Sequence, residues 1–80
     1  MLYVIYSIFD KLAKQFSLPR YAVNEDVAMR EFKLFVDSVK SDKDDFVLYK
    51  LGVYDVESGS LNSCEPIIIC HGGDFVNVEA

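Results

Sequence analysis

The chain has 80 residues, which is enough for one domain and too few for two separate hydrophobic cores. Hydrophobic residues make up 51% of it and charged residues 26%, a composition that excludes a disordered chain. The net charge of −5 excludes a protein that holds nucleic acid through an overall positive field. Seven of the eight basic residues precede Phe46, so the sequence still allows a local basic patch.

The first predicted element is a strand from Leu2 to Phe9, in which both alternating sets of positions are largely apolar. The even positions are the more aliphatic set and are expected to face a helix. The odd positions carry Tyr3, Ser7 and Phe9, which suit a surface partly in contact with water. This run is far shorter than the ~20 residues of a membrane span and has no basic stretch before it. We therefore expect neither a membrane segment nor a signal peptide.

Residues 11–23 are predicted to form a loop or a short edge strand, because Ser17 and Pro19 interrupt any helical pattern. A connection of this length is long for so small a domain, and long ordered loops often carry function. The segment also contains three basic residues and one tyrosine, namely Lys11, Lys14, Arg20 and Tyr21.

A helix is predicted from Glu25 to Val39, with Asn24 as its N-cap and acidic residues in its first turn. Apolar residues recur through it at helical spacing, at Ala28, Phe32, Phe35, Val36 and Val39. Acidic residues at positions 42, 44 and 45 follow the helix. They lack the glycine and the distal glutamate of an EF-hand, so we interpret them as a solvated loop.

The second long strand is predicted from Phe46 to Tyr54. Gly52 interrupts it and indicates either a bulge or a close approach of another backbone. Residues 55–60 have the composition of a hairpin turn, with Gly59 available for a positive φ.

The return strand is predicted to begin near Leu61, and Pro66 indicates that this part lies at a sheet edge or a bulge. Ile67, Ile68 and Ile69 are apolar on both faces, so we expect them to be buried. Residues 72 and 73 are glycines that end the strand, and Asp74 to Ala80 forms a tail or a short extra strand.

Cys64 and Cys70 are not expected to form a disulfide, because six extended residues separate them by ~20 Å. Together with His71 they match no common zinc-binding spacing, and no fourth ligand is evident. We expect buried free thiols, no metal and no cofactor.

The predicted order is β-α-β-β, which gives a single α+β domain over residues 1–80. Its sheet would have three to four strands, with the one helix packed on one face. The other face then needs a partner, because monomers rarely expose an apolar patch of a few hundred Å². A second copy of the chain is the simplest cover, so we expect a homodimer.

No nucleophile motif, phosphate-binding loop or spaced metal motif is present, so we expect that the protein is not an enzyme. One hypothesis is that Tyr3 and Tyr49, with Phe9 as a third candidate, stack on unpaired bases. The residues that would then contact phosphate are Lys11, Lys14, Arg20 and Lys50. The other hypothesis is that the aromatic residues are ordinary strand formers in a core or a dimer seam. The residues alone favour this second hypothesis.

Three segments carry a likeness to a known family. They are Tyr3-Val4-Ile5-Tyr6-Ser7 followed by Asp10, then Asn24 with Ala28, Arg30 and Phe32, and finally Asp45-Phe46-x-Leu48-Tyr49-Lys50-Leu51-Gly52-x-Tyr54-Asp55 followed by Ser58-Gly59. Together they resemble the small non-structural protein of gokushovirus-type microviruses, which are phages with single-stranded DNA genomes. The likeness extends as far as Leu61 and implies nothing about Cys64, Cys70 or His71.

The resemblance implies a phage DNA-binding or replication-control protein in the cytoplasm of a bacterial host. Its implied task is to favour single-strand synthesis and packaging over further duplex replication. Phage replication or capsid-assembly proteins are the implied protein partners, and no catalytic residue is implied. The alternative is a homodimeric protein-interaction adaptor that does not contact nucleic acid.

Overall fold

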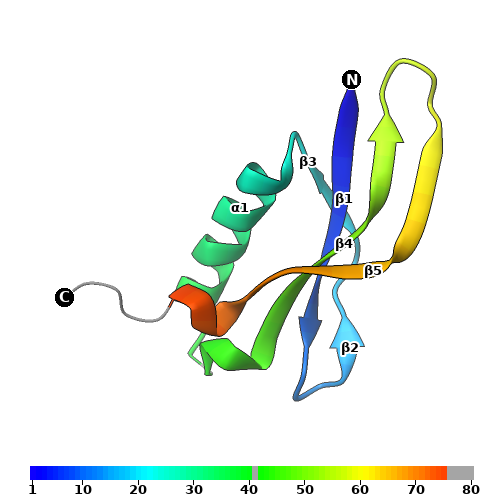
Figure 1. Ribbon diagram of the computed structural model, residues 1–80. Helices are drawn as coiled ribbons and strands as arrows, with labels where there is room; N and C mark the ends of the chain where they lie inside the picture. Colours follow the sequence, from blue (N-terminus) through cyan, green and yellow to red (C-terminus); the bar gives the residue numbers. More distant parts are fainter. Residues whose placement is uncertain (41, 76–80) are drawn as a thin grey trace.

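The computed structural model describes residues 1–40 and 42–75, which form an antiparallel sheet with one α-helix beside it (Figure 1). The elements in chain order are β1 (Leu2–Asp10), β2 (Gln15–Phe16), β3 (Arg20–Ala22), α1 (Glu25–Ser38), the 3-10 turn η1 (Lys43–Asp45), β4 (Phe46–Asp55), β5 (Leu61–His71) and the 3-10 turn η2 (Gly72–Phe75). The α+β class is therefore confirmed. The first two residues of the predicted tail, Asp74 and Phe75, lie in η2, and residues 76–80 lie outside the described part of the chain.

The sheet is built around β1 and β4, which pair with each other, and β5 pairs with the other side of β4. The two short strands β2 and β3 both pair with the free side of β1, one after the other along its length. The order β-α-β-β is confirmed for the long elements. The segment predicted as a loop or a short edge strand supplies the two short strands, which raise the sheet to five strands.

A turn at the end of β1 brings β2 back alongside it. The Asp10 carboxylate accepts hydrogen bonds from the backbone N–H groups of Leu12 and Ala13, at 3.0 and 3.2 Å. Lys14 then adopts a φ of 61° and donates its own N–H to the Asp10 carbonyl. These local bonds reverse the chain within four residues.

Helix α1 begins where the sequence predicts, because the Asn24 side chain accepts a 2.9 Å hydrogen bond from the Val27 N–H. It ends one residue earlier than predicted, since Val39 has extended backbone angles. Its buried face consists of Ala28, Phe32 and Val36. These residues pack with strand residues into one core, whose buried members include Tyr6, Leu48 and Cys70.

The even positions of β1 face the helix, as predicted. Val4 and Tyr6 are buried, and Ile8 packs against the core. The Tyr6 ring is only 2% exposed, yet its hydroxyl donates a 2.5 Å hydrogen bond to Glu31 on α1. Burial, and then this bond to a carboxylate, raise the pKa of Tyr6 to about 12.

The predicted irregularity at Gly52 is confirmed. The register of β4 shifts between Lys50 and Gly52 against β5, and a Cβ at Gly52 would lie 2.3 Å from the Asn62 carbonyl oxygen. The β4–β5 hairpin closes through residues 55–60, with Gly59 at a φ of +75°. A glycine at position 52 thus permits the close approach of the two backbones.

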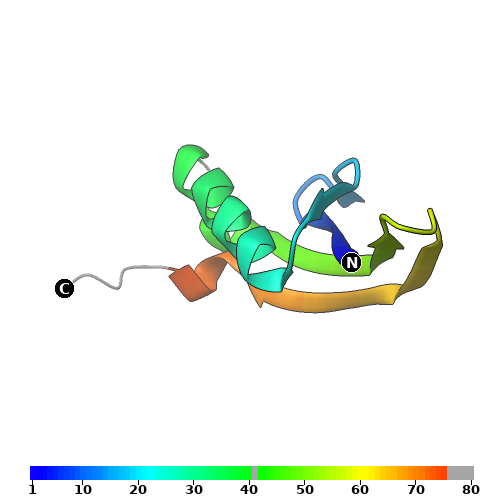
Figure 2. The ribbon, with the colours of Figure 1, turned by 90° about the horizontal axis from the view of Figure 1, so that it is seen from above.

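The expectation that Ile67, Ile68 and Ile69 are buried is wrong for the first two residues. Ile67 is 52% exposed and Ile68 is 47% exposed, whereas Ile69 packs against the core. The 14 residues of α1 extend about 21 Å, less than half of the 44 Å length of the molecule. The β4–β5 hairpin therefore reaches past the helix, and β5 is a sheet edge there (Figures 1 and 2).

The two cysteines are free thiols, but only Cys70 is buried. Burial and then the nearby Asp74 carboxylate raise its pKa to about 11. The expectation of a buried thiol is wrong for Cys64, which is exposed because it lies on the same uncovered edge as Ile67. In the part of the chain that the structure describes, no helix is long and apolar enough to cross a membrane.

Candidate nucleic-acid interface

The face of the sheet turned away from α1, here called the open face, carries most of the exposed aromatic side chains. Paired positions point to the same face of a sheet, so the strand register defines this surface. Tyr3 pairs with Tyr54, which pairs with Leu61, and Ile5 pairs with Tyr21. Further along β1, Ser7 pairs with Tyr49 and Phe9 pairs with Val47 and Phe16.

The chain covers the centre of the open face with its own loop. The Ser7 hydroxyl donates a 2.8 Å hydrogen bond to the Ser17 carbonyl and lies 3.1 Å from the Ser17 hydroxyl. Ser17 in turn accepts a hydrogen bond from the Ile8 N–H through its side chain. Ser7 is fully buried as a result. The loop between β2 and β3 thus divides the open face into two aromatic regions.

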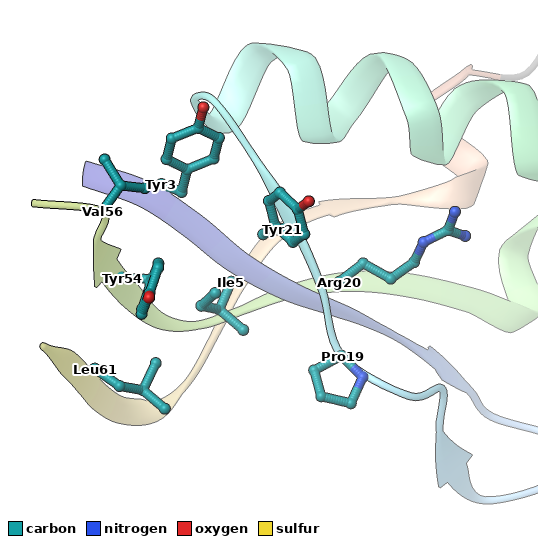
Figure 3. Close-up of a pocket in the computed structure, with 8 residues that line it drawn as sticks. All are labelled: Tyr3, Ile5, Pro19, Arg20, Tyr21, Tyr54, Val56 and Leu61. Carbon is teal, nitrogen blue, oxygen red and sulfur yellow. The ribbon is translucent and has the colours of Figure 1, made fainter. Parts of the chain in front are cut away.

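The first region, here called the tyrosine hollow, has a cavity volume of about 630 Å³. Its lining residues are Tyr3, Ile5, Pro19, Arg20, Tyr21, Tyr54, Val56 and Leu61. Figure 3 shows the three tyrosine rings grouped around Ile5, on strands β1, β3 and β4. Tyr3 and Tyr21 make an edge-to-face contact with their ring centres 5.6 Å apart. Tyr21 is 68% exposed, so a large aromatic surface faces solvent.

The second region is the aromatic cluster formed by Phe9, Phe16 and Tyr49. The ring centres of Phe9 and Phe16 lie 4.8 Å apart. The Tyr49 ring centre lies 5.2 Å from that of Phe16 and 6.3 Å from that of Phe9. These distances are those of aromatic rings in mutual contact. Val47, on the same face, is only 3% exposed. The rings of this cluster therefore pack largely on one another, whereas the hollow is open.

Three of the predicted phosphate-binding residues lie along the β2–β3 side of the sheet. Lys11 and Lys14 are in the turn after β1, Arg20 is in β3, and all three are exposed. In the described part of the chain they form no ion pair. Arg20 pairs with Tyr6 in the register, so its side chain points toward the helix side of the sheet, and Figure 3 shows it extending away from Tyr54 and Leu61.

The structure does not bring all six predicted site residues together. Tyr3 and Tyr49 share the open face but lie in its two different regions. Lys50 pairs with Tyr6 in the register, so it lies on the helix side of the sheet, and its ammonium is 3.6 Å from the Glu25 carboxylate. Tyr49 and Lys50 therefore point to opposite faces.

Charge differs between the two edges of the sheet. Lys11, Lys14 and Arg20 lie on the β2–β3 side, whereas the β4–β5 hairpin carries Asp55, Glu57 and Glu65. The Met1 ammonium lies 3.7 Å from both Asp55 and Glu57. A hydrogen bond from the Glu57 backbone N–H lowers the pKa of Asp55. An anion is therefore attracted to the β2–β3 side and repelled from the hairpin.

Sequence reasoning did not assign Tyr54 to the site, and it named Tyr21 only as part of the long connection and not as a stacking residue. Strict alternation along β4 would place Tyr54 on the same face as Lys50 and on the opposite face from Tyr49. The irregular register around Gly52 instead places Tyr54 on the open face with Tyr49. Gly52 was the available signal, although a glycine does not say how many residues a bulge contains. Tyr21 reaches the open face only because β3 pairs with β1, and a strand of three residues has no detectable period.

The acidic residues after the helix have a structural role in the 3-10 turn η1. The Asp42 carboxylate accepts a 3.1 Å hydrogen bond from the Asp44 N–H and caps the turn. Over residues 1–40 and 42–75, no three His, Cys, Asp or Glu side chains are grouped as metal ligands would be.

Two comparisons gave no match and one gave a family. No curated protein and no solved structure matches the chain. A family model described as "Phage ORF5 protein" matches residues 3–75, which include all of the helix and strands except Leu2, the first residue of β1.

Proposed function

We propose that this chain, which belongs to the phage ORF5 protein family, binds single-stranded DNA through the open face of its sheet. The observation that carries the proposal is the row of exposed tyrosines beside a basic side of the same sheet. The likeness to the gokushovirus-type non-structural protein supports a place in microvirus replication. There the protein would act in the cytoplasm of the bacterial host and favour single-strand synthesis and packaging.

Unpaired bases can stack on exposed tyrosine rings, and each such stack is worth ~1–3 kcal/mol. Paired bases in a duplex present only their edges, so a surface of this kind prefers single strands. Lys11, Lys14 and Arg20 provide the electrostatic part of the binding. Because the whole chain carries a charge of −5, that part depends on these few cations and is easily screened by salt.

We propose smaller contributions from the other two predicted site residues. Tyr49 is only partly exposed and its ring packs against Phe9 and Phe16, so little of it is free for a base. Lys50 would have to leave Glu25 and reach around the sheet to contact a phosphate on the open face. Tyr3, Lys11 and Lys14 therefore form the main proposed interface, and Arg20 contributes from the β3 edge, where its side chain points toward the helix side.

Fluorescence-anisotropy titrations with single- and double-stranded oligonucleotides test the function directly. We expect tighter binding of single strands, with a slope of log K against log salt near −2 if all three cations contact phosphate. The double variant Lys11→Glu/Lys14→Glu should weaken binding and flatten that slope. Arg30→Glu changes the same kind of charge on the exposed side of α1 and should have little effect. Absence of binding at low salt, or affinity that does not change with salt, would contradict the proposal.

A homodimeric adaptor is the second candidate function, and the charge pattern favours it. A two-fold axis parallel to the strands would place the basic β2–β3 side of one copy opposite the acidic hairpin of its partner. The exposed apolar residues of the tyrosine hollow, Tyr21, Tyr54, Val56 and Leu61, would then be buried between two open faces. Such a dimer would present its helices to phage replication or capsid-assembly proteins.

Sedimentation of the protein without DNA tests this second candidate. The adaptor hypothesis predicts a mass of two chains, and it predicts that Tyr3→Asp produces monomers by placing a charge in the seam. A wild-type mass of one chain, or a mass that Tyr3→Asp leaves unchanged, would exclude the adaptor.

A further inference from the structure

We infer that the tyrosine hollow holds one unpaired nucleobase between Tyr21 and Tyr54, with the phosphate of that nucleotide toward the β2–β3 edge of the sheet. This inference rests on the proposed binding of single-stranded DNA. It adds a defined binding site for one base to the open face, where the sequence predicts only individual aromatic residues that could stack on bases.

The spacing of the strands fits a stacked base. Tyr21 on β3 pairs with Ile5 and Tyr54 on β4 pairs with Tyr3, so the two tyrosines stand on either side of β1 and two residues apart along it. Two strand spacings and this offset place their backbones ~12 Å apart. A flat ring in contact with a tyrosine on each side needs ~7–8 Å between the two rings. The two exposed tyrosine side chains therefore have to lean toward each other across Ile5 by ~4–5 Å in total. Tyr3 contacts Tyr21 edge-to-face and holds it upright at one side of the gap.

The size and lining of the hollow fit the same ligand. Its volume of about 630 Å³ lies within the usual range of small-ligand sites, roughly 300–1,000 Å³. Ile5 lies between Tyr21 and Tyr54 in Figure 3 and provides an apolar floor. Leu61 and Val56 extend the apolar surface toward the hairpin. Every base has a π-face and the lining is mainly apolar, so we expect the site to accept all four bases.

The charges around the hollow orient the nucleotide. Lys11 and Lys14 lie in the turn between β1 and β2, at the same edge of the sheet as Tyr21. Arg20 is adjacent to Tyr21 on this edge, but it pairs with Tyr6, so its side chain points toward the helix side and away from the hollow. On the other side, Asp55 and Glu57 repel a phosphate. The sugar-phosphate chain is therefore expected to follow β3 toward Lys14 and Lys11, with the base directed across the sheet into the hollow.

The aromatic cluster provides an internal comparison, because the ring surfaces of Phe9, Phe16 and Tyr49 already contact one another. A base could stack there only on the outer side of Phe16, which is 45% exposed. The inference thus assigns most of the base-dependent affinity to the hollow and little of it to the cluster.

A double-mutant cycle between protein and DNA tests the inference. The wild-type protein, Tyr21→Leu and Tyr49→Leu are each titrated with an oligothymidine and with an oligomer of equal length whose residues are abasic. Tyr21→Leu keeps an apolar side chain at an exposed position, so the fold is expected to persist, and circular dichroism checks this. We expect Tyr21→Leu to weaken oligothymidine binding about 5- to 140-fold, the equivalent of ~1–3 kcal/mol of stacking. Its affinity for the abasic oligomer should not change, and Tyr49→Leu should have a much smaller effect.

Three results would overturn the inference in different ways. If Tyr49→Leu removes the base-dependent affinity and Tyr21→Leu does not, DNA is bound as proposed but at the aromatic cluster. If Tyr21→Leu alters the sedimenting mass and leaves the base dependence intact, the hollow is a seam between two copies. If no variant, including the wild type, binds either oligomer, the proposed function fails together with the base site.

Discussion

Tyr6 combines a core position with a polar contact. Its ring packs under α1 with almost no exposure, while its hydroxyl donates to the Glu31 carboxylate at the edge of the core. A buried phenol with such a partner strongly favours its neutral form, which raises its pKa to about 12 from an ordinary value of 10.0. The sequence predicts that position 6 faces the helix, but a strand pattern alone does not identify a partner 25 residues away.

The raised pKa of Tyr6 makes stability depend on pH in a defined range. Because the pKa of Tyr6 is higher in the folded than in the unfolded chain, the neutral phenol contributes fully to the free energy of unfolding below about pH 10. This contribution is lost as the pH rises toward 12. We expect Tyr6→Phe to be less stable than wild type by about 1–2 kcal/mol at neutral pH, because the hydrogen bond is lost.

Urea unfolding of both proteins between pH 7 and pH 12 measures this effect. The difference in the free energy of unfolding should shrink above about pH 10, since only the wild type has a phenol to ionise. Other residues that titrate in this range are common to both proteins and cancel in the difference. A difference that stays constant up to pH 12 would show that the environment of Tyr6 is wrongly described.

At the scale of elements, the sequence predicts helices and strands that are long enough to show a hydrophobic period. It does not predict short strands whose position depends on one or two hydrogen bonds. Helix α1 and strands β1 and β4 are long enough to show a period, and Asn24 marks the helix start through a local bond. Strands β2 and β3 have two and three residues, so no period exists to detect. They are held in place by hydrogen bonds that the Asp10 carboxylate accepts from the Leu12 N–H and the Ser17 carbonyl accepts from the Ser7 hydroxyl. These bonds depend on how the chain returns along β1.

The exposure of β5 has a related cause. Three successive isoleucines predict burial, but burial requires a second layer, and the length of α1 decides where that layer ends. The composition of β5 does not show how far helix α1 extends over it. The same limit applies to the candidate site, since Tyr3 and Arg20 were identified in isolation and their neighbours Tyr21 and Tyr54 were not.

The close contact at Gly52 gives a prediction for the β4–β5 pair. In Gly52→Ala the new methyl group would meet the Asn62 carbonyl oxygen at 2.3 Å, so one of the two backbones must move. Overpacking and an unfavourable backbone conformation together should cost about 3 kcal/mol in the free energy of unfolding.

Gly59→Ala is the matched control for this substitution. Gly59 also has a positive φ, but no atom lies within 4 Å of the position of its missing Cβ. We expect a cost of about 1 kcal/mol there, from the backbone conformation alone. Equal losses for the two variants in urea unfolding would contradict the account of the bulge.

At the scale of the whole molecule, a short helix lies on a sheet that is longer than it. The helix covers one face near one end, and the β2–β3 loop covers only the centre of the other face, over Ser7. The expectation that one helix leaves apolar surface exposed is therefore confirmed. The apolar surface that stays exposed includes the tyrosine hollow. It lies between the basic β2–β3 edge of the sheet and the acidic β4–β5 hairpin.

The central claim is that the open face of the sheet, and not the helix, contacts single-stranded DNA. An NMR titration of the labelled protein with an oligothymidine at low salt tests it most directly. We predict that chemical shifts change first at Tyr3, Tyr21 and Tyr54, with smaller changes at Lys14. Arg30 and Leu34, on the exposed side of α1, should show no change. Shift changes centred on the outer side of the helix, with the tyrosine hollow unaffected, would contradict the account.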